Sequence, residues 1–168
     1  MQIRTIRPQD VSQAAAVEAA CFPAAEAASP AAIAARAAAF PGHFWVAEEK
    51  GEIRGFVNGF VTDSPVIQDE MYEDPSLHNP AGRYQAVFGL DVLPAWQGRG
   101  IARQLLCTLI DAARSQGRAG VILTCKEHMI PFYEKFGFCS QGLSQSVHGG
   151  AAWYDMLLTF ARQPGKQG

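Results

Sequence analysis

The chain has 168 residues and a mass of 18.1 kDa, which corresponds to one ordinary domain. Hydrophobic residues make up 48% of it and charged residues 18%, so it can bury a normal core and is not a disordered segment. The formal net charge of −2 argues against nucleic acid as a partner, because affinity for a phosphate backbone depends on clustered Lys and Arg. A small phosphorylated ligand remains compatible with this charge.

The four cysteines indicate neither a disulfide framework nor a zinc site. They are spaced by 86, 18 and 14 positions, and none forms a C-x-x-C pair. We therefore expect reduced thiols. The first residues contain no apolar stretch of signal-peptide length, and no segment approaches the ~20 apolar residues that cross a bilayer. The sequence thus predicts a cytoplasmic protein with no membrane partner.

The first third of the chain predicts a strand, two helices and a β-hairpin. A short strand at 2–6 precedes a helix that Asp10 caps and that runs to about residue 20. Ser29-Pro30 starts the second helix, because Ser caps free amides and Pro fits the first turn. Residues 43–49 and 53–61 are rich in β-forming residues on both sides of a short turn, which indicates a hairpin.

The rest of the chain alternates between strands and helices. Residues 63–80 contain three prolines and five acidic residues, and form either a substrate-side loop or a solvated connector. We then expect strands at 84–92, 121–125 and 151–160, and helices at 101–115 and 130–136. Gly89 indicates a bulge or a close backbone approach within its strand. One domain therefore spans 1–160, with a flexible tail at 161–168.

The turn at 93–100, between a strand and a helix, carries the strongest chemical signal. A helix that begins after glycines presents unpaired N–H groups, and its dipole also favours an anion. Gly98 and Gly100 allow close approach because they lack a Cβ atom, and Arg99 and Arg103 add charge-assisted contacts. The sequence therefore predicts a phosphate site here.

The motif around this turn discriminates between kinds of phosphate. It has no P-loop lysine, and Arg103 occupies the place of the last glycine of a dinucleotide fingerprint, so an oxidoreductase is disfavoured. Gln97-x-x-Gly100-x-Ala102, preceded by Val92-x-Pro94, resembles the acyl-coenzyme-A pyrophosphate loop of the GNAT N-acetyltransferase superfamily. The segment 131–138 resembles the helix and turn that follow the fifth strand of that superfamily.

Further segments resemble one branch of the superfamily, the arylalkylamine (serotonin) N-acetyltransferases. Residues 77–82 and 125–138 are similar to that branch, and 18–29 to the mobile first loop of its bacterial members. Together the resemblances cover about 140 of the 168 residues. They imply an α/β (α+β) GNAT fold: a mixed central sheet of about six or seven strands flanked by helices, with a bulged fourth strand and a pyrophosphate-binding loop before the next helix.

The resemblance implies transfer of an acetyl group from acetyl-CoA to a primary amine by direct attack in a ternary complex, with no metal. The implied acceptor is a small arylalkylamine or a polyamine-like molecule. The implied cofactor-binding residues are Leu90, Asp91, Val92, Gln97, Gly98, Arg99, Gly100, Ile101, Ala102 and Arg103. Backbone N–H groups at 90–92 would hold the acetyl carbonyl, which makes oxyanion stabilisation a main-chain task.

Tyr133 is the expected general acid, because a phenol with an ordinary pKa of about 10 stays protonated at neutral pH and can protonate the departing thiolate. The base stays open among Glu26, Asp91, Glu127 and His128. The vertebrate enzymes of this branch pass the proton through two histidines on strand four. Ala86 and Phe88 stand at those positions here, so that relay cannot be carried over.

The acceptor-binding residues are expected to be Phe22, Pro23, Glu26, Phe88 and Thr124. Their aromatic members favour an arylalkylamine, whereas the acidic residues of the loops favour a polyamine. Two other functions stay open: a coenzyme-A-binding regulatory module with little catalysis, and an enzyme that acetylates a peptide amino terminus or lysine. Acetylation of Cys125 as an intermediate is less favoured than packing of this thiol in the core. The sequence leaves monomer and homodimer open.

Overall fold

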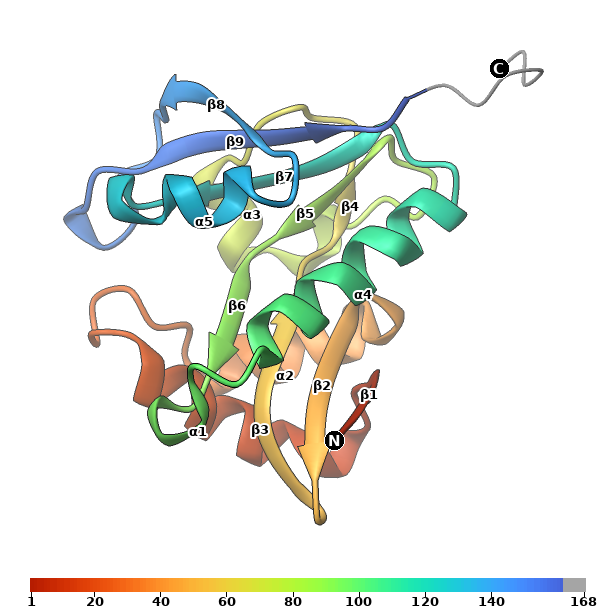
Figure 1. The fold of residues 1–168 in the computed structure, drawn as a ribbon, viewed down its shortest axis with the longest axis vertical. Coiled ribbons are helices and arrows are strands. Elements are labelled where there is room, and N and C mark those ends of the chain that lie inside the picture. Colours follow the sequence, from red (N-terminus) through yellow and green to blue (C-terminus); the bar gives the residue numbers. More distant parts are fainter. Residues whose placement is uncertain (162–168) are drawn as a thin grey trace.

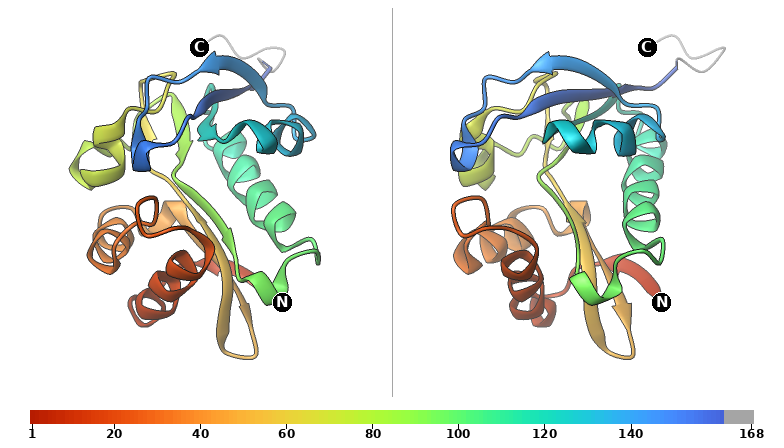
Figure 2. Two further views of the ribbon diagram at one scale, coloured as in Figure 1. Left: turned by 90° about the vertical axis from the view of Figure 1, so that its left-hand side faces the viewer. Right: turned by 60° about the vertical axis from the view of Figure 1, so that its left-hand side comes forward.

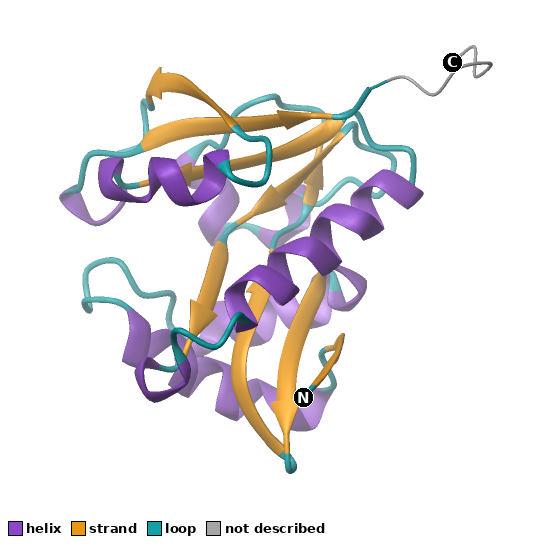
Figure 3. Cartoon of the chain, viewed as in Figure 1, coloured by secondary structure: helices purple, strands orange, loops and turns teal. Residues whose placement is uncertain are grey.

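The computed structural model describes residues 1–161, and its strands form two sheets (Figures 1 and 3). In sheet order, the first contains β1 (Gln2–Thr5), β2 (Phe44–Glu49), β3 (Glu52–Asn58) and β6 (Gly89–Val92). The second contains β4 (Val61–Thr62), β5 (Tyr84–Val87), β7 (Gly120–Cys125), β9 (Tyr154–Thr159) and β8 (Cys139–Leu143). Only the β5–β7 pairing is parallel among the described strands. The expected α/β class is confirmed, with two sheets in place of one central sheet.

Five α-helices lie among the described residues: α1 (Val11–Cys21), α2 (Pro30–Ala39), α3 (Asp69–Glu73), α4 (Ile101–Ser115) and α5 (Ile130–Glu134). Figure 2 shows α1 and α2 on one face of the first sheet and α4 on the other. The expected helix at 130–136 ends earlier, and the irregular segment at 63–80 contains the short helix α3. Of the expected tail, residues 162–168 lie outside the described residues.

The start of α2 follows the prediction, whereas the start of α1 does not. Ser29 Oγ accepts a hydrogen bond from the Ala32 N–H at 3.1 Å, with Pro30 in the first turn. Asp10 does not cap α1. Its carboxylate accepts from the Arg4 guanidinium at 2.6 and 3.1 Å and from the Arg7 N–H at 2.8 Å. The cap prediction was wrong because a buried arginine competes for this carboxylate.

The hairpin between β2 and β3 turns through Lys50 and Gly51, both in the left-handed region with φ of 52° and 79°. This backbone matches the twist of a two-residue hairpin. The second arm is shorter than predicted, because β3 ends at Asn58 and the chain then enters the other sheet as β4.

The strand expected at 84–92 divides at Phe88 into β5 and β6, which belong to different sheets. β5 pairs with β7 and β6 pairs with β3, so β6 is the edge strand of its sheet. Gly89 lies at the division. A Cβ atom there would lie 3.1 Å from Asp91 Oδ1, tighter than an ordinary contact. The bulge prediction identified the right glycine, and the division separates β6 from β7 (Figure 1).

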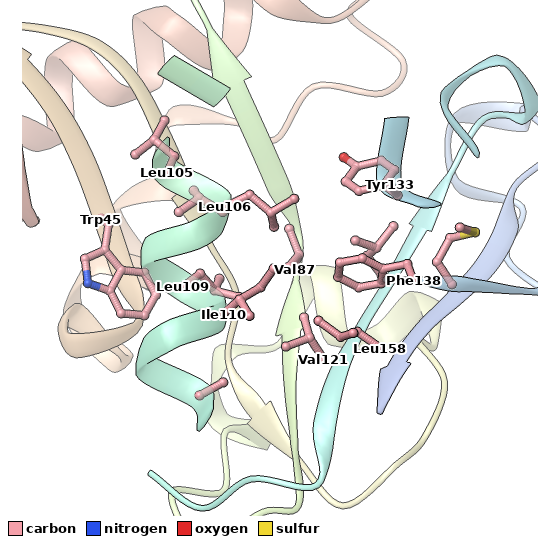
Figure 4. Packing of buried hydrophobic residues seen from close by; sticks show 14 of the residues in the cluster. Trp45, Val87, Leu105, Leu106, Leu109, Ile110, Val121, Tyr133, Phe138 and Leu158 are labelled. Carbon is pink, nitrogen blue, oxygen red and sulfur yellow. The ribbon is translucent and has the colours of Figure 1, made fainter. Parts of the chain in front are cut away.

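Helix α4 buries the apolar stripe that its spacing predicts: Ile101, Leu105, Leu106, Leu109, Ile110 and Ala113. These side chains pack against β2, β3, β6 and β7, and Figure 4 shows the cluster with Trp45 and Val121 on either side. Full burial of each large apolar side chain contributes about 1.5–3 kcal/mol to folding. The packing of α4 therefore stabilises the arrangement of both sheets. The missed strand β8 is exposed along its length, which explains its weak hydrophobic signal.

Candidate active site

A cavity of about 840 Å³ lies where β6 and β7 diverge. Its walls come from α1 and the loop after it, α2, α3, the β5–β6 strand, β7, α5 and the segment between β8 and β9. Because β6 is an edge strand, it presents backbone groups to this space rather than to a neighbouring strand. The division at Phe88 therefore creates the site.

The structure brings most of the sequence-predicted site residues to this cavity. The residues that line it include Phe22, Pro23, Glu26, Phe88, Leu90, Asp91, Val92, Gln97, Thr124 and Tyr133. Among the candidates for the base, Glu26, Asp91 and His128 line the cavity and Glu127 does not. Ala86 is fully buried outside the cavity wall, in an aromatic cluster with Phe40 and Phe60.

A second cavity of about 230 Å³ lies at the turn between β6 and α4. It is lined by Val92, Trp96, Gln97, Gly98, Gly100, Ile101, Ala102, Arg103 and Phe132. Val92 and Gln97 line both cavities, so the two spaces adjoin. Among the described residues, no protein acceptor is bonded to the N–H groups of 98–103. A row of free N–H groups at the start of a fifteen-residue helix is a suitable anion site.

The conformation of this turn depends on its glycines. Gly98 and Gly100 have φ of 78° and 79°, where residues with a Cβ atom are strained. Arg99 does not line either cavity; its guanidinium lies 4.4 Å from the centre of the Trp96 ring. The Gln97 side chain was expected at the cofactor, and its Nε2 donates to the Val92 carbonyl at 3.1 Å. It therefore ties the end of β6 to the turn.

Tyr133 projects from α5 into the large cavity, and its hydroxyl is directed away from Phe138 (Figure 4). Burial, together with the nearby Cys125 and Asp91 groups, raises the pKa of this phenol well above its ordinary value of 10. The hydroxyl is therefore protonated at neutral pH. Phe132 and Phe138 pack edge-on against the ring at 5.0 and 5.8 Å, in the packing role expected for both.

Several contacts join the walls at one end of the cavity. The Tyr72 hydroxyl lies 2.8 Å from Thr124 Oγ1, and its ring stacks on His148. His148 Nε2 lies 2.8 Å from the Glu26 carbonyl oxygen, and Lys126 Nζ lies 2.7 Å from Glu26 Oε1. These contacts join α3, β7, the α1–α2 loop and the β8–β9 segment.

Beneath the α1–α2 loop the cavity wall carries buried charged groups, of which sequence reasoning assigned Asp91 to the site but not Glu18 or Arg36. Glu18 Oε2 accepts from the Ala28 N–H at 2.8 Å, and Arg36 Nη2 donates to the Tyr72 carbonyl at 2.9 Å. Burial and the neighbouring Glu18 carboxyl raise the pKa of Asp91 well above its ordinary value. Burial lowers the pKa of Arg36, and the two carboxyls oppose this shift.

No group of three or more His, Cys, Asp or Glu side chains within residues 1–161 is placed to hold a metal ion. In the same part of the chain, no helix combines the length and the apolar character needed to cross a bilayer.

Comparison with known proteins agrees with this geometry. The sequence model of the Acetyltransferase (GNAT) family matches residues 12–138. A probable N-acetyltransferase family 8 member 5 of Mus musculus is 34% identical over 105 residues, 60% of this chain and 40% of that protein. Serotonin N-acetyltransferase of Mesocricetus auratus is 30% identical over 95 residues, 56% of this chain and 44% of that protein. The chain thus spans less than half the length of these curated relatives.

A solved structure shares the fold across nearly the whole chain. The GphF GNAT-like decarboxylase, in complex with isobutyryl-CoA, superposes with a TM-score of 0.82 at 24% identity. The match covers 95% of this chain and 99% of that one. The family model matches residues 12–138, and the two adjoining cavities and the glycine turn agree with that match. This chain therefore belongs to the GNAT acetyltransferase family.

Proposed function

We propose that this protein is an N-acetyltransferase that moves an acetyl group from acetyl-CoA to a small primary amine, most suitably an arylalkylamine. One observation carries the proposal: the glycine turn with its free N–H groups adjoins, through Val92 and Gln97, a cavity with acidic and aromatic walls. A diphosphate at the turn would direct a thioester arm along the free edge of β6. The amine would enter from the α1–α2 side.

The charge of the large cavity supports a cationic acceptor. Its described walls carry four carboxyl side chains, Glu18, Glu26, Glu73 and Asp91, against the cations of Arg36 and Lys126. A cavity with negatively charged groups and a low dielectric constant raises the local concentration of ammonium ions. It also disfavours a carboxylated acyl donor, so we expect no decarboxylation of malonyl-CoA.

The aromatic side chains favour an arylalkylamine over a polyamine. Phe88 packs against Tyr72 with ring centroids 5.3 Å apart, and both line the cavity with Phe22 and Trp153. Aromatic pairs of this kind contribute about 0.5–1.5 kcal/mol beyond the burial of their area. Similarity to a serotonin N-acetyltransferase supports the same acceptor class.

Each chemical requirement of the transfer has a candidate group. Backbone N–H groups at 90–92 would stabilise the developing oxyanion, and Tyr133 would protonate the thiolate. Burial raises the pKa of Cys125 to about 11, so its thiol is a weak nucleophile at neutral pH. This supports direct attack by the amine over an acetyl-cysteine intermediate.

Two alternatives have less support. A polypeptide acceptor needs a groove along which its chain can extend, whereas contacts from Glu26 to Lys126 and His148 cross this end of the cavity. A regulatory module that binds coenzyme A has no need for Tyr133, which projects into the cavity.

Thiol release from acetyl-CoA tests the proposal with a panel of arylalkylamines, polyamines, amino acids and peptides. We expect turnover with arylalkylamines and none with malonyl-CoA alone. Binding of coenzyme A without turnover on any amine would identify a regulatory module, and turnover only with peptides would identify a polypeptide acceptor. Mass spectrometry after incubation with acetyl-CoA alone should find no acetyl adduct on Cys125, because direct transfer forms none.

A further inference from the structure

Four buried side chains beside the large cavity have polar atoms with no protein partner. These atoms are Glu18 Oε1, both Asp91 carboxylate oxygens, Arg36 Nε and both amide atoms of Asn58. The residues are 5%, 1%, 4% and 0% exposed, so bulk water does not solvate them. Most buried polar groups in proteins are hydrogen-bonded, and an unmet one costs roughly 1–3 kcal/mol.

Two of these groups, the Asp91 carboxyl and the Asn58 amide, border the same space at Gly89. A Cβ atom at Gly89 would lie 3.1 Å from Asp91 Oδ1 and 3.5 Å from Asn58 Nδ2, so both groups border the space that this glycine leaves free. Glu18, Arg36 and Asp91 also line the cavity itself. The cavity therefore has a polar end beside β6, which is the strand expected to hold the acetyl carbonyl.

The charges at this polar end are unequal. Among the described residues, Arg36 is the cation that both Glu18 and Asp91 face, and its Nη2 is already bonded to the Tyr72 carbonyl. Burial and the neighbouring Glu18 carboxyl raise the pKa of Asp91 well above its ordinary value. This makes the Asp91 carboxylate a stronger proton acceptor than an exposed one.

We propose that the Glu18–Asp91 carboxyl pair is the proton acceptor for the substrate amine, with the Arg36 guanidinium and the Asn58 amide beside it. This inference rests on the proposed acetyltransferase function. It names a base that the family resemblance leaves open, since Ala86 and Phe88 replace the histidines of the vertebrate relay.

The step balances in protons and electrons. The bound alkylammonium gives one proton to the carboxyl pair, and the freed nitrogen lone pair attacks the thioester carbonyl carbon. The C–N bond forms and the C–S bond breaks, and the thiolate takes the Tyr133 proton. The nitrogen releases its second proton, which restores the phenol, and the pair returns its own proton to solvent. Free coenzyme A, the amide and one solvent proton are the products.

The titratable and charged groups that face Asp91 come from three helices. They are Glu18 and Cys21 from α1, Arg36 from α2 and Tyr133 from α5. Burial raises the pKa of Cys21 to about 12 and that of Tyr133 still further, so both stay neutral. A guanidinium stays charged throughout this range.

Two acceptors of the same shape separate proton removal from packing. 2-Phenylethylamine is an ammonium ion at neutral pH, whereas O-benzylhydroxylamine has almost the same outline and an uncharged nitrogen. In Asp91→Asn and Glu18→Gln, kcat/KM for 2-phenylethylamine should fall roughly 100-fold or more, the range for loss of a general base. For O-benzylhydroxylamine it should fall less than about threefold, because no ammonium proton needs to be removed.

Glu26→Gln is the matched control, because it removes a carboxyl from the same cavity that belongs to an ion pair with Lys126. In this variant kcat/KM for 2-phenylethylamine should fall far less than 100-fold, because charge attraction is weakened while proton removal is retained. Equal losses for both acceptors in Asp91→Asn would overturn the inference and leave the acetyltransferase function standing.

Absence of thiol release by the wild-type protein with every acceptor would instead overturn the proposed function. A carbon-13 NMR titration of the uncomplexed protein tests the raised pKa of Asp91 by itself. This pKa should lie above its ordinary value in the wild type and fall in Glu18→Gln, which removes the neighbouring carboxyl. An ordinary pKa for Asp91 in the wild type would contradict the inference whatever the acceptor.

Discussion

The phenol ring of Tyr72 stacks on the imidazole of His148, with ring centroids 4.9 Å apart and planes 23° apart. His148 also reaches the Glu26 carbonyl, so one side chain links α3, the β8–β9 segment and the α1–α2 loop. This residue lies outside every segment that resembles the family, yet it lines the cavity and joins its walls. Acceptor binding should therefore depend on it.

His148→Ala should raise KM for the amine by about 5–30-fold, because it removes a stacked pair and a hydrogen bond worth about 1–2 kcal/mol together. The dissociation constant for coenzyme A, measured by calorimetry, should not change. Val147→Ala is the control, since the neighbouring Val147 side chain is 72% exposed. A loss of coenzyme A affinity in His148→Ala with an unaltered amine KM would argue against a role in acceptor binding.

Tyr133→Phe should lower kcat at least tenfold, the range for loss of a general acid, with coenzyme A affinity retained. The raised pKa of this phenol gives the sign of the pH dependence. A group whose pKa is raised keeps its proton to higher pH. At any pH below about 10, the ordinary pKa of tyrosine, deprotonation of Tyr133 should therefore cause no loss of kcat. A pH–rate profile of both proteins checks this. Equal kcat in the two across the whole pH range would remove Tyr133 from the mechanism.

Gly100→Ala should weaken coenzyme A binding roughly 5–30-fold, because a Cβ residue at φ 79° costs about 1–2 kcal/mol and the turn must shift to relieve it. The expected effect is conformational, since no atom lies within 4 Å of the added Cβ. Gly42→Ala provides the comparison: its Cβ also meets nothing, and its φ is not positive. Similar affinities for the two variants would show that the turn does not depend on this backbone conformation.

Local signals in the sequence predicted the donor end of the site and most of the fold. Helix α4 begins and ends where its apolar spacing predicts, and the glycines at 98 and 100 adopt the conformation for which they are suited. These features depend on residues within a few positions of one another. Gly89 likewise indicated an irregularity in the strand predicted at 84–92. No local signal indicated that the two halves of this strand, β5 and β6, belong to different sheets.

The acceptor end depends on contacts between distant segments, which residue patterns do not encode. Glu18 and Asp91, 73 positions apart, line the same cavity, and His148 contacts Glu26 across 122 positions. One signal was present: Arg36 is the only charged residue of the alanine-rich helix α2, and it is 4% exposed. A lone arginine in such a helix indicates a buried electrostatic partner. Asp10 was misassigned although its partner Arg4 is only six positions away, because Arg4 lies on another element, the strand β1.

The Arg4–Asp10 pair should be important for stability, because both side chains are largely buried, at 11% and 6% exposure, and their bonds are 2.6 and 3.1 Å long. Asp10→Asn should lower the free energy of unfolding at pH 7 by roughly 3 kcal/mol, since it leaves Arg4 without its main partner. The hydrogen bond from Arg4 lowers the pKa of Asp10. The pair therefore contributes its stability above the unfolded value of about 3.9 and loses it as the pH falls through the lower folded value.

Urea unfolding of wild type and Asp10→Asn between pH 7 and pH 3 measures this difference, which should shrink only at the acidic end. Asp111→Asn removes a carboxylate from an exposed ion pair with Arg114, in which the side chains are 75% and 54% exposed. Solvent screens that pair, so the control should change stability by at most about 0.5 kcal/mol. Equal effects of the two substitutions, or a difference that persists unchanged at pH 3, would mean that Arg4 is held by Glu48 at 2.8 Å rather than by Asp10.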